Sequence, residues 1–309
     1  MIRFHGASMV HTLIVTAGLI TWAHAAQPDA CKATTNAALR SSRAGMQRDK
    51  WLATGRCENS PDGATQKACD QQTAADARDA QAAYRSQREA RQAVCTRLGP
   101  GPYSPTIDAA RFVTSIDNPL FPLTPGQTLI YEGQTPEGLE HSEFAVTHGT
   151  RIILGVTCIE VHDTVTVGGM LREDTLDWFA QDREGNVWYF GENSKQIDGG
   201  LIVGLAGSWT AGVDGAQPGI VMEAHPAVGD FYRQEFLLGQ AEDMAEIVSL
   251  AQPVTVPAGS FPTCLEAAET SPLEPDALEH KYYAAGVGTV LTVDPATGER
   301  SELVGIRTE

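Results

Sequence analysis

Short runs in which hydrophobic and polar residues alternate fill the chain from Thr128 onward and predict β-strands. The clearest run extends from Cys158 to Glu192, where β-branched and aromatic residues alternate with polar ones. Gly168-Gly169 and Glu184-Gly185-Asn186 interrupt this run where tight turns would fall. Parallel neighbours would need connections of about a dozen residues, and no gap between these runs has room for one. The sequence therefore predicts antiparallel strands.

A similar order of residues recurs about a hundred positions later. Cys158-Ile-Glu-Val-His-Asp-Thr164 is echoed by Cys264-Leu-Glu-Ala-Ala-Glu-Thr270, and Asp177-Trp-Phe-Ala180 is echoed by Lys281-Tyr-Tyr-Ala284. We infer two related meanders, the second running from Asp230 to Ile306. The expected fold is mainly β, a curved antiparallel sheet arranged as a half-barrel or a sandwich. The sequence does not choose between these, but a strongly bent sheet would leave a concave side able to hold a ligand.

Residues 26–98 have a different composition, because Ala, Arg, Gln, Lys and Asp dominate and Val and Ile are nearly absent. Two helices joined by a loop are predicted. Cys31 and Cys57 are 26 positions apart, as are Cys69 and Cys95, so antiparallel helices would place Cys57 beside Cys69 and Cys31 beside Cys95. We therefore expect a helical hairpin with a disulfide at each end. Residues 99–110, which begin with a Gly- and Pro-rich stretch, are expected to link it to an antiparallel β domain of residues 111–309.

Residues 1–25 have the features of a signal peptide: Arg3, a short apolar run and Ala23-His24-Ala25. The apolar run is about half of the roughly 20 residues that span a bilayer, so no transmembrane span is expected. A periplasmic or secreted location follows, and such compartments favour disulfides. Cys158 and Cys264 occupy matching positions in the two meanders, which favours a third disulfide between them. Buried free thiols, or a metal site on that strand, are the alternatives.

The formal net charge of −17 is unevenly distributed. Residues 26–105 contain 12 Lys and Arg against 8 Asp and Glu, whereas the chain after residue 105 contains 9 against 31. An acidic body argues against nucleic acid as a partner, since affinity for nucleic acid rests on basic residues that neutralise phosphates. Solubility is the simplest explanation of the charge. The alternatives are attraction of cations and docking of the basic segment on the acidic body.

Two sets of residues are candidates for binding sites. Clustered aromatic residues could line a ligand cavity, although core packing explains them more simply; they are Trp178, Trp188, Tyr189, Trp209 and Tyr282. Acidic residues and a histidine could bind a divalent cation such as calcium, although no calcium-loop spacing accompanies them; they are Glu235, Glu242, Asp243 and His280. No other cofactor is predicted. No nucleophile elbow, zinc-protease helix or phosphate-binding loop is present, so no catalytic residue is assigned.

Several short motifs extend over most of residues 110–300: Asn118-Pro-Leu-Phe-Pro-Leu, Tyr131-Glu-Gly133, Ile153-Leu-Gly-Val-x-Cys158, Asp177-Trp178, Gly185-Asn-Val-Trp-Tyr-Phe-Gly191, Asp214-Gly-Ala-x-Pro-Gly219, Ala241-Glu-Asp243 and Lys281-Tyr-Tyr-Ala284. In these motifs the chain resembles an uncharacterised family of bacterial exported β-rich proteins, a domain of unknown function. The resemblance leaves the cysteine hairpin uncovered and implies no activity.

Three functional hypotheses remain. The first is an exported, non-enzymatic binding or envelope-associated protein that holds a small apolar ligand or a divalent cation on its acidic β domain, with the helical hairpin contacting a protein partner. The second is a hydrolase or lyase that uses acidic residues or a bound metal. The third is a structural or adhesion protein. The absence of a catalytic signature favours the first.

Overall fold

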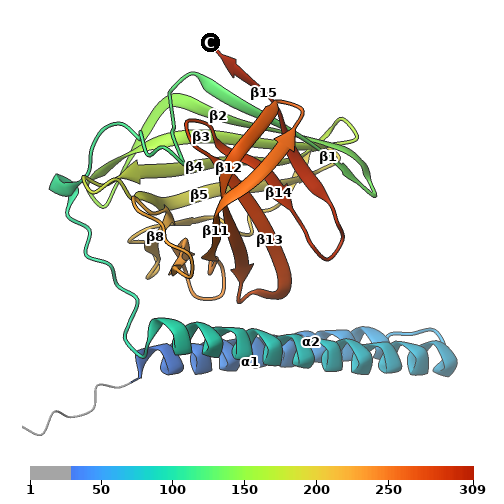
Figure 1. Ribbon diagram of the computed structural model, residues 1–309. Coiled ribbons are helices and arrows are strands. Elements are labelled where there is room, and N and C mark those ends of the chain that lie inside the picture. The colour runs from blue at the N-terminus through green and yellow to red at the C-terminus, as the bar shows by residue number, and fades with distance from the viewer. Residues whose placement is uncertain (1–28) are drawn as a thin grey trace, which may run out of the picture.

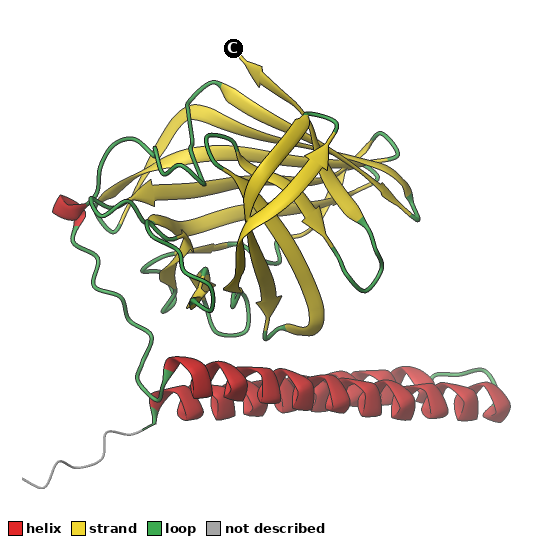
Figure 2. Cartoon of the chain, in the orientation of Figure 1, coloured by secondary structure: helices red, strands yellow, loops and turns green. Residues whose placement is uncertain are grey.

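The computed structural model describes residues 29–309, so the expected signal peptide lies outside the described residues. The described chain contains two long helices followed by a β body (Figure 1). No helix in this described part is long and apolar enough to cross a membrane. The two helices lie side by side along one end of the β body, and an extended segment connects them to it (Figure 2).

The helical hairpin consists of α1 (Ala30–Glu58) and α2 (Gly63–Leu98). Asp29 and Asp62 cap the two N-termini, since their carboxylates accept hydrogen bonds from the backbone nitrogens of Lys32 and Ala64 respectively. Disulfides join Cys31 to Cys95 and Cys57 to Cys69, so the predicted staples are present at both ends. They compensate for a thin interface, because few residues of either helix are buried.

The β body is one continuous, curved antiparallel sheet that does not close on itself, which confirms the predicted fold class. The strands follow the order β10-β8-β5-β4-β3-β2-β1-β15-β14-β13-β12-β11-β9, with β6 and β7 pairing only with β5. Their bounds are β1 Gln127–Thr135, β2 Gly138–Ile153, β3 Val156–Val167, β4 Met170–Gln181, β5 Val187–Asp198, β6 Leu201–Gly204, β7 Trp209–Thr210, β8 Gln217–Met222, β9 Phe231–Arg233, β10 Glu235–Phe236, β11 Met244–Val256, β12 Gly259–Ser271, β13 Glu274–Ala284, β14 Gly288–Val293 and β15 Arg300–Thr308.

Two meanders, β1 to β5 and β11 to β15, stand next to each other in the sheet and meet where β1 pairs with β15. The echoed sequences occupy equivalent places in them. Glu160 on β3 pairs with Trp178 on β4, and Glu266 on β12 pairs with Tyr282 on β13. In each pair the aromatic side chain donates a hydrogen bond to the glutamate, at 3.3 Å and 3.2 Å.

The structure corrects the expected third disulfide, because Cys158 and Cys264 are free and buried. Five strands separate β3 from β12 in the sheet. The two meanders stand side by side in the sheet, so equivalent positions in them are separated by the width of one meander. The sequence repeat that suggested a disulfide between Cys158 and Cys264 therefore places the two cysteines too far apart to form one. Each thiol instead packs in a separate apolar cluster. Burial raises the pKa of the Cys158 thiol to about 12, which leaves it in the unreactive protonated form.

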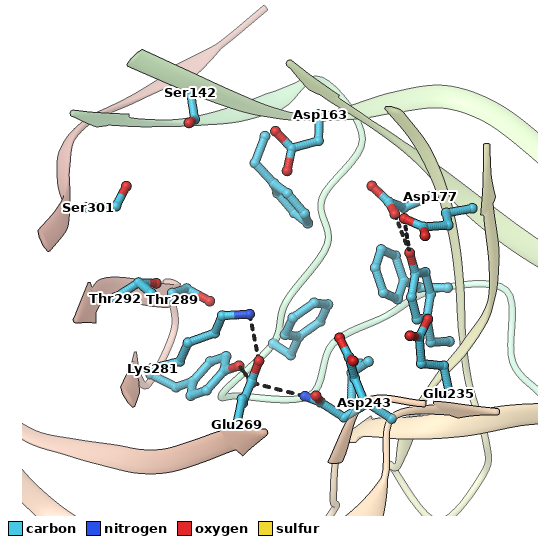
Figure 3. Close-up of a pocket in the computed structure, with 18 of the residues that line it drawn as sticks. Ser142, Asp163, Asp177, Glu235, Asp243, Glu269, Lys281, Thr289, Thr292 and Ser301 are labelled. Carbon is cyan, nitrogen blue, oxygen red and sulfur yellow. Dashed lines mark hydrogen bonds and ion pairs between the residues drawn. The ribbon is translucent and has the colours of Figure 1, made fainter. Parts of the chain in front are cut away.

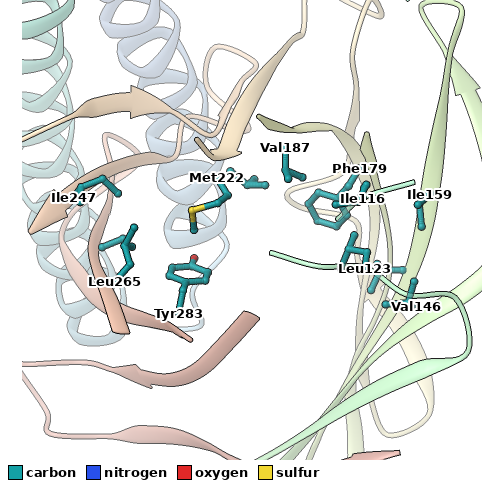
Figure 4. Close-up of a cluster of buried hydrophobic side chains, with 13 residues drawn as sticks. Ile116, Leu123, Val146, Ile159, Phe179, Val187, Met222, Ile247, Leu265 and Tyr283 are labelled. Atoms are coloured by element: carbon teal, nitrogen blue, oxygen red, sulfur yellow. The ribbon is translucent and has the colours of Figure 1, made fainter. Parts of the chain in front are cut away.

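The main hydrophobic core lies on the concave side of the sheet (Figure 4). Phe179 and Val187 from the first meander belong to the same cluster as Leu265 and Tyr283 from the second. The Pro-rich segment before β1 contributes Leu123 to this core. Buried apolar side chains therefore hold the two halves of the curved sheet together.

The basic hairpin docks on the acidic body. This docking is one of the alternative explanations that the uneven charge distribution suggested. Arg91 on α2 forms a buried bidentate ion pair with Glu242, with Nη2 2.7 Å from Oε1 and Nε 2.9 Å from Oε2. Arg97 pairs with Glu246 at 2.5 Å in a more exposed position. Gln87 donates to the carbonyl oxygen of Leu273 in the turn between β12 and β13.

We expect Arg91→Met to lower the free energy of unfolding by about 3 kcal/mol, since it leaves the Glu242 carboxylate buried without its cation. Arg97→Met is the matched control and should cost less than about 1 kcal/mol, because the Arg97–Glu246 pair is about 40% exposed. The double variant Arg91→Met with Glu242→Leu should recover most of the loss. Urea unfolding of the three variants checks this, and equal effects at both arginines would contradict it.

Candidate functional site

A cavity of about 370 Å³ lies within the curved sheet, between the first meander and the second (Figure 3). Alternate residues of a β-strand point to the same face of the sheet. Asp177 and Phe179 of β4 therefore both line the cavity, and so do Lys281 and Tyr283 of β13. The lining residues are Phe121, Tyr131, Ser142, Phe144, Asp163, Asp177, Phe179, Tyr189, Glu192, Val221, Gln234, Glu235, Asp243, Glu269, Lys281, Tyr283, Thr289, Thr292 and Ser301.

One part of the cavity wall is aromatic. Phe179 stacks on Tyr189 with ring centroids 4.8 Å apart and planes 14° apart. Phe121 lies at 5.4 Å from Phe179 and 6.4 Å from Phe144. Offset and tilted rings in this range attract each other beyond the area that they bury. These residues give the cavity a rigid apolar surface.

The adjoining part of the same wall is acidic. Asp177 on β4 pairs directly with Glu192 on β5 across the strands. Like charges in opposite positions destabilise a sheet unless something neutralises or bridges them. The Tyr189 hydroxyl bridges this pair, at 2.5 Å from Asp177 Oδ1 and 3.2 Å from Glu192 Oε2. Glu235 and Asp243 approach the same space from β10 and from the residue before β11.

The cavity contains a single basic side chain, Lys281. Its ammonium lies 2.6 Å from Glu269. Glu269 also accepts hydrogen bonds from the Tyr283 hydroxyl at 3.0 Å and from Gln234 Nε2 at 2.9 Å. Burial alone would lower the pKa of Lys281, but Glu269, Glu279 and Asp243 together raise it above its usual value. Lys281 and Glu269 therefore form a charged, fully paired unit.

The other carboxylates titrate at higher pH than usual. Burial, reinforced by Glu173 and Glu140 and opposed by Lys281, raises the pKa of Asp163 to about 7. Burial likewise raises the pKa of Glu192 to about 7, with Glu173, Asp243 and Asp163 adding to the effect. The pKa of Asp177 and that of Glu235 are also raised, chiefly by burial. At neutral pH the cavity therefore holds protons on carboxyl groups that are normally ionised.

The cavity does not end at these residues. A second hollow of about 640 Å³ shares Glu192, Glu235, Asp243, Glu269 and Lys281 with it and extends to the turn between β12 and β13. That turn receives the hydrogen bond from Gln87 of α2. The end of the second hollow at this turn is thus next to the helical hairpin.

The aromatic candidates separate into two groups. Tyr189 lines the cavity, and Trp209 packs edge-on against it at 5.3 Å outside the lining. Trp178 donates to Glu160 and lies under the Arg151 guanidinium, Trp188 donates to Asp182, and Tyr282 donates to Glu266. These last three side chains are not among the cavity residues.

The cation candidates also separate. Glu235 and Asp243 line the cavity. Glu242 accepts its hydrogen bonds from Arg91 and the Gly239 nitrogen, and His280 Nδ1 lies 2.7 Å from Glu266. Across residues 29–309 no group of three or more His, Cys, Asp or Glu side chains is arranged to hold a metal ion.

Sequence reasoning missed most of the cavity, including Asp163, Asp177, Glu192, Glu269 and Lys281. A signal was present, because Asp177 interrupts an apolar run on β4 and Asp163 falls on the face of β3 that also carries Val161. Polar residues at core positions of a strand mark sites that serve something other than packing. The short motifs singled out in the sequence also contain cavity residues, among them Phe121, Tyr131, Asp177, Asp243 and Lys281.

The raised pKa of Asp163 predicts how stability depends on pH. The folded protein binds the proton of Asp163 more tightly than the unfolded chain does. Below about pH 4 the group is protonated in both states and does not lower the free energy of unfolding, whereas between about pH 4 and pH 7 it lowers that free energy progressively as pH rises. Asp163→Asn, which cannot ionise, should therefore gain stability relative to the wild type between pH 5 and pH 8. We expect a gain of at least about 1 kcal/mol, since one pKa unit corresponds to about 1.4 kcal/mol. Urea unfolding at both pH values checks this, and a constant difference would contradict it.

No family model and no curated protein matches the chain. Among solved structures, the chain is similar to a protein that carries the provisional description of a lipoprotein from Parabacteroides distasonis ATCC 8503. The identity is 14% and the TM-score 0.30, and the match covers 61% of this chain and 98% of the other. At this TM-score the match carries no argument about function.

Proposed function

We propose that this protein is an exported binding protein that holds a small molecule in the cavity of its curved sheet. The observation that carries the proposal is the cavity itself, which occupies a place where side chains would otherwise fill a core. Its volume of about 370 Å³ lies within the range of about 300 to 1,000 Å³ that is typical of ligand sites. Stacked aromatic rings beside a few polar groups are the usual composition of such sites.

The two disulfides support an extracytoplasmic location, since such bonds persist in oxidising compartments. The apolar N-terminal segment with its small-residue ending is the feature that supports export. A small-molecule binder in this location would meet its ligand outside the cytoplasm. On this proposal the helical hairpin would contact a protein partner while it remains docked on the body through Arg91.

Filling the cavity tests the proposal. Ser142 on β2 lines the cavity, so Ser142→Phe should place a ring inside it. The uncharged fluorophore N-phenyl-1-naphthylamine should gain fluorescence on binding the wild type, and Ser142→Phe should weaken this binding at least about tenfold, or about 1.4 kcal/mol. Ser260→Phe is the matched control, because Ser260 is exposed on β12 and outside the lining, and it should bind as the wild type does. Equal binding by all three proteins would overturn the proposal.

A second candidate function is acid–base catalysis in the same cavity. The observation that favours it is the pKa of about 7 for both Asp163 and Glu192, which suits proton transfer at neutral pH. On this account Glu192→Gln should abolish turnover of a responsive substrate in a panel of glycosides and esters, while Glu137→Gln, in the exposed turn between β1 and β2, should not. Turnover that survives both Glu192→Gln and Asp163→Asn would remove the cavity from consideration as an active site.

A further inference from the structure

Carboxylates greatly outnumber cations in the cavity. Six carboxyl groups line it, namely those of Asp163, Asp177, Glu192, Glu235, Asp243 and Glu269. Lys281 is the one basic lining residue, and it pairs with Glu269. Five carboxyl groups are therefore left without a cation from the lining.

Hydrogen-bond donors are also short in the cavity. The Tyr283 hydroxyl, Gln234 Nε2 and Lys281 all serve Glu269. The Tyr131 hydroxyl donates its one hydrogen to the Thr289 carbonyl oxygen, so it cannot also donate to a carboxylate. Three of the lining donors are thus committed to Glu269, and the Tyr189 hydroxyl is the lining donor that serves another carboxylate, that of Asp177.

Tyr189 cannot satisfy both of its acidic neighbours. A phenol carries one hydrogen and can donate it to one acceptor at a time. With its oxygen 2.5 Å from Asp177 and 3.2 Å from Glu192, the hydroxyl donates to Asp177. Glu192 then needs a proton of its own or a donor from outside the protein.

Asp163 also lacks a hydrogen-bond donor for one of its carboxyl oxygens. Its Oδ1 oxygen is buried and accepts no hydrogen bond from any residue in the described part of the chain. The charged groups that act on this carboxyl are Glu173 from β4, Glu140 from β2 and Lys281 from β13. Figure 3 shows the Asp163 carboxyl pointing into the cavity from the wall opposite Lys281. A buried carboxylate oxygen without a donor is costly unless something fills the space beside it.

We propose that the ligand is a protonated organic amine whose ammonium group binds between Asp163, Asp177 and Glu192 while its apolar body lies on the aromatic wall. This inference rests on the proposed function and names the class of ligand. An ammonium supplies both the positive charge and the donors that the acidic wall lacks. Aromatic faces such as those of Phe179 and Tyr189 also attract cations.

A bare metal ion fits these residues less well than an amine. No group of three or more potential ligands is suitably arranged within residues 29–309. The cavity of about 370 Å³ is much larger than one ion, and a wall of phenyl rings offers a metal no ligand. An amine with an apolar body contacts both the acidic and the aromatic part of the wall.

Binding of an ammonium should displace protons from the cavity. Asp163 and Glu192, with pKa values of about 7, are partly protonated at neutral pH, and a cation favours their ionised forms. The amine itself stays protonated up to about pH 10, as lysine does. Affinity should therefore increase from pH 6 to pH 8, with release of protons to the buffer.

Calorimetry with two probes of the same shape tests this. Tryptamine carries an ammonium where tryptophol carries a hydroxyl. We expect the wild type to bind tryptamine at pH 8 at least about tenfold more tightly than tryptophol, with at least about a tenfold loss at pH 6. The heat of binding should vary with the ionisation enthalpy of the buffer, which reports proton release without any variant.

Two variants complete the design. Asp163→Asn should weaken tryptamine binding at least about tenfold and leave tryptophol unchanged, whereas Glu137→Gln, exposed outside the cavity, should change neither. Equal affinity for tryptamine and tryptophol, without pH dependence, would overturn the inference while leaving the proposed function intact. The same conclusion follows if no amine binds but N-phenyl-1-naphthylamine does. If N-phenyl-1-naphthylamine also fails to bind, both the amine inference and the proposed binding function are wrong.

Discussion

The antiparallel pairing of β1 with β15 is the interaction on which the architecture depends. It is the one pairing that joins the meander β1 to β5 to the meander β11 to β15. The paired residues are separated by most of the body's length, so the entropy of closing that loop is recovered only when both meanders are formed. Curvature brings the far ends of the sheet together as well. There Gly219 touches the backbone of Arg233, and an added Cβ would lie 2.4 Å from its carbonyl oxygen.

The sequence predicts those features that depend on local periodicity. Alternation identified the strands, composition identified the helices, and the 26-residue spacing of Cys31 from Cys57 and Cys69 from Cys95 identified both disulfides. Whether Cys158 forms a disulfide could not be predicted, because this depends on which strands become neighbours in the sheet. The same limit applies to the cavity. Alternation tells which residues share a face, as Asp177 and Phe179 do, but not whether that face meets solvent, core or a hollow.

The cavity is a local departure from the rules that stabilise the rest of the body. Several buried polar groups elsewhere are paired, as in the Arg91–Glu242 ion pair and the glutamates that accept from Trp178 and Tyr282. Within the hollow, Asp177 and Glu192 lie opposite each other on adjacent strands and share one tyrosine hydroxyl, and Asp163 Oδ1 accepts no hydrogen bond from the described residues. Such an arrangement lowers stability, and proteins keep unfavourable groups of this kind where a ligand restores the balance. The aromatic rings beside these carboxyl groups make the space specific in shape as well as in charge.

The helical hairpin also acts as a mechanical element. With 29 residues, α1 is about 44 Å long, and disulfides at both ends prevent the helices from sliding or separating. Its attachment to the body runs through α2, with Gln87 on the β12–β13 turn beside the wider hollow and Arg91 on Glu242. A stiff arm fixed near one end works as a lever. A force on the distant tip near Trp51 would rotate the hairpin about Arg91 and would act first on the β12–β13 turn that borders the second hollow.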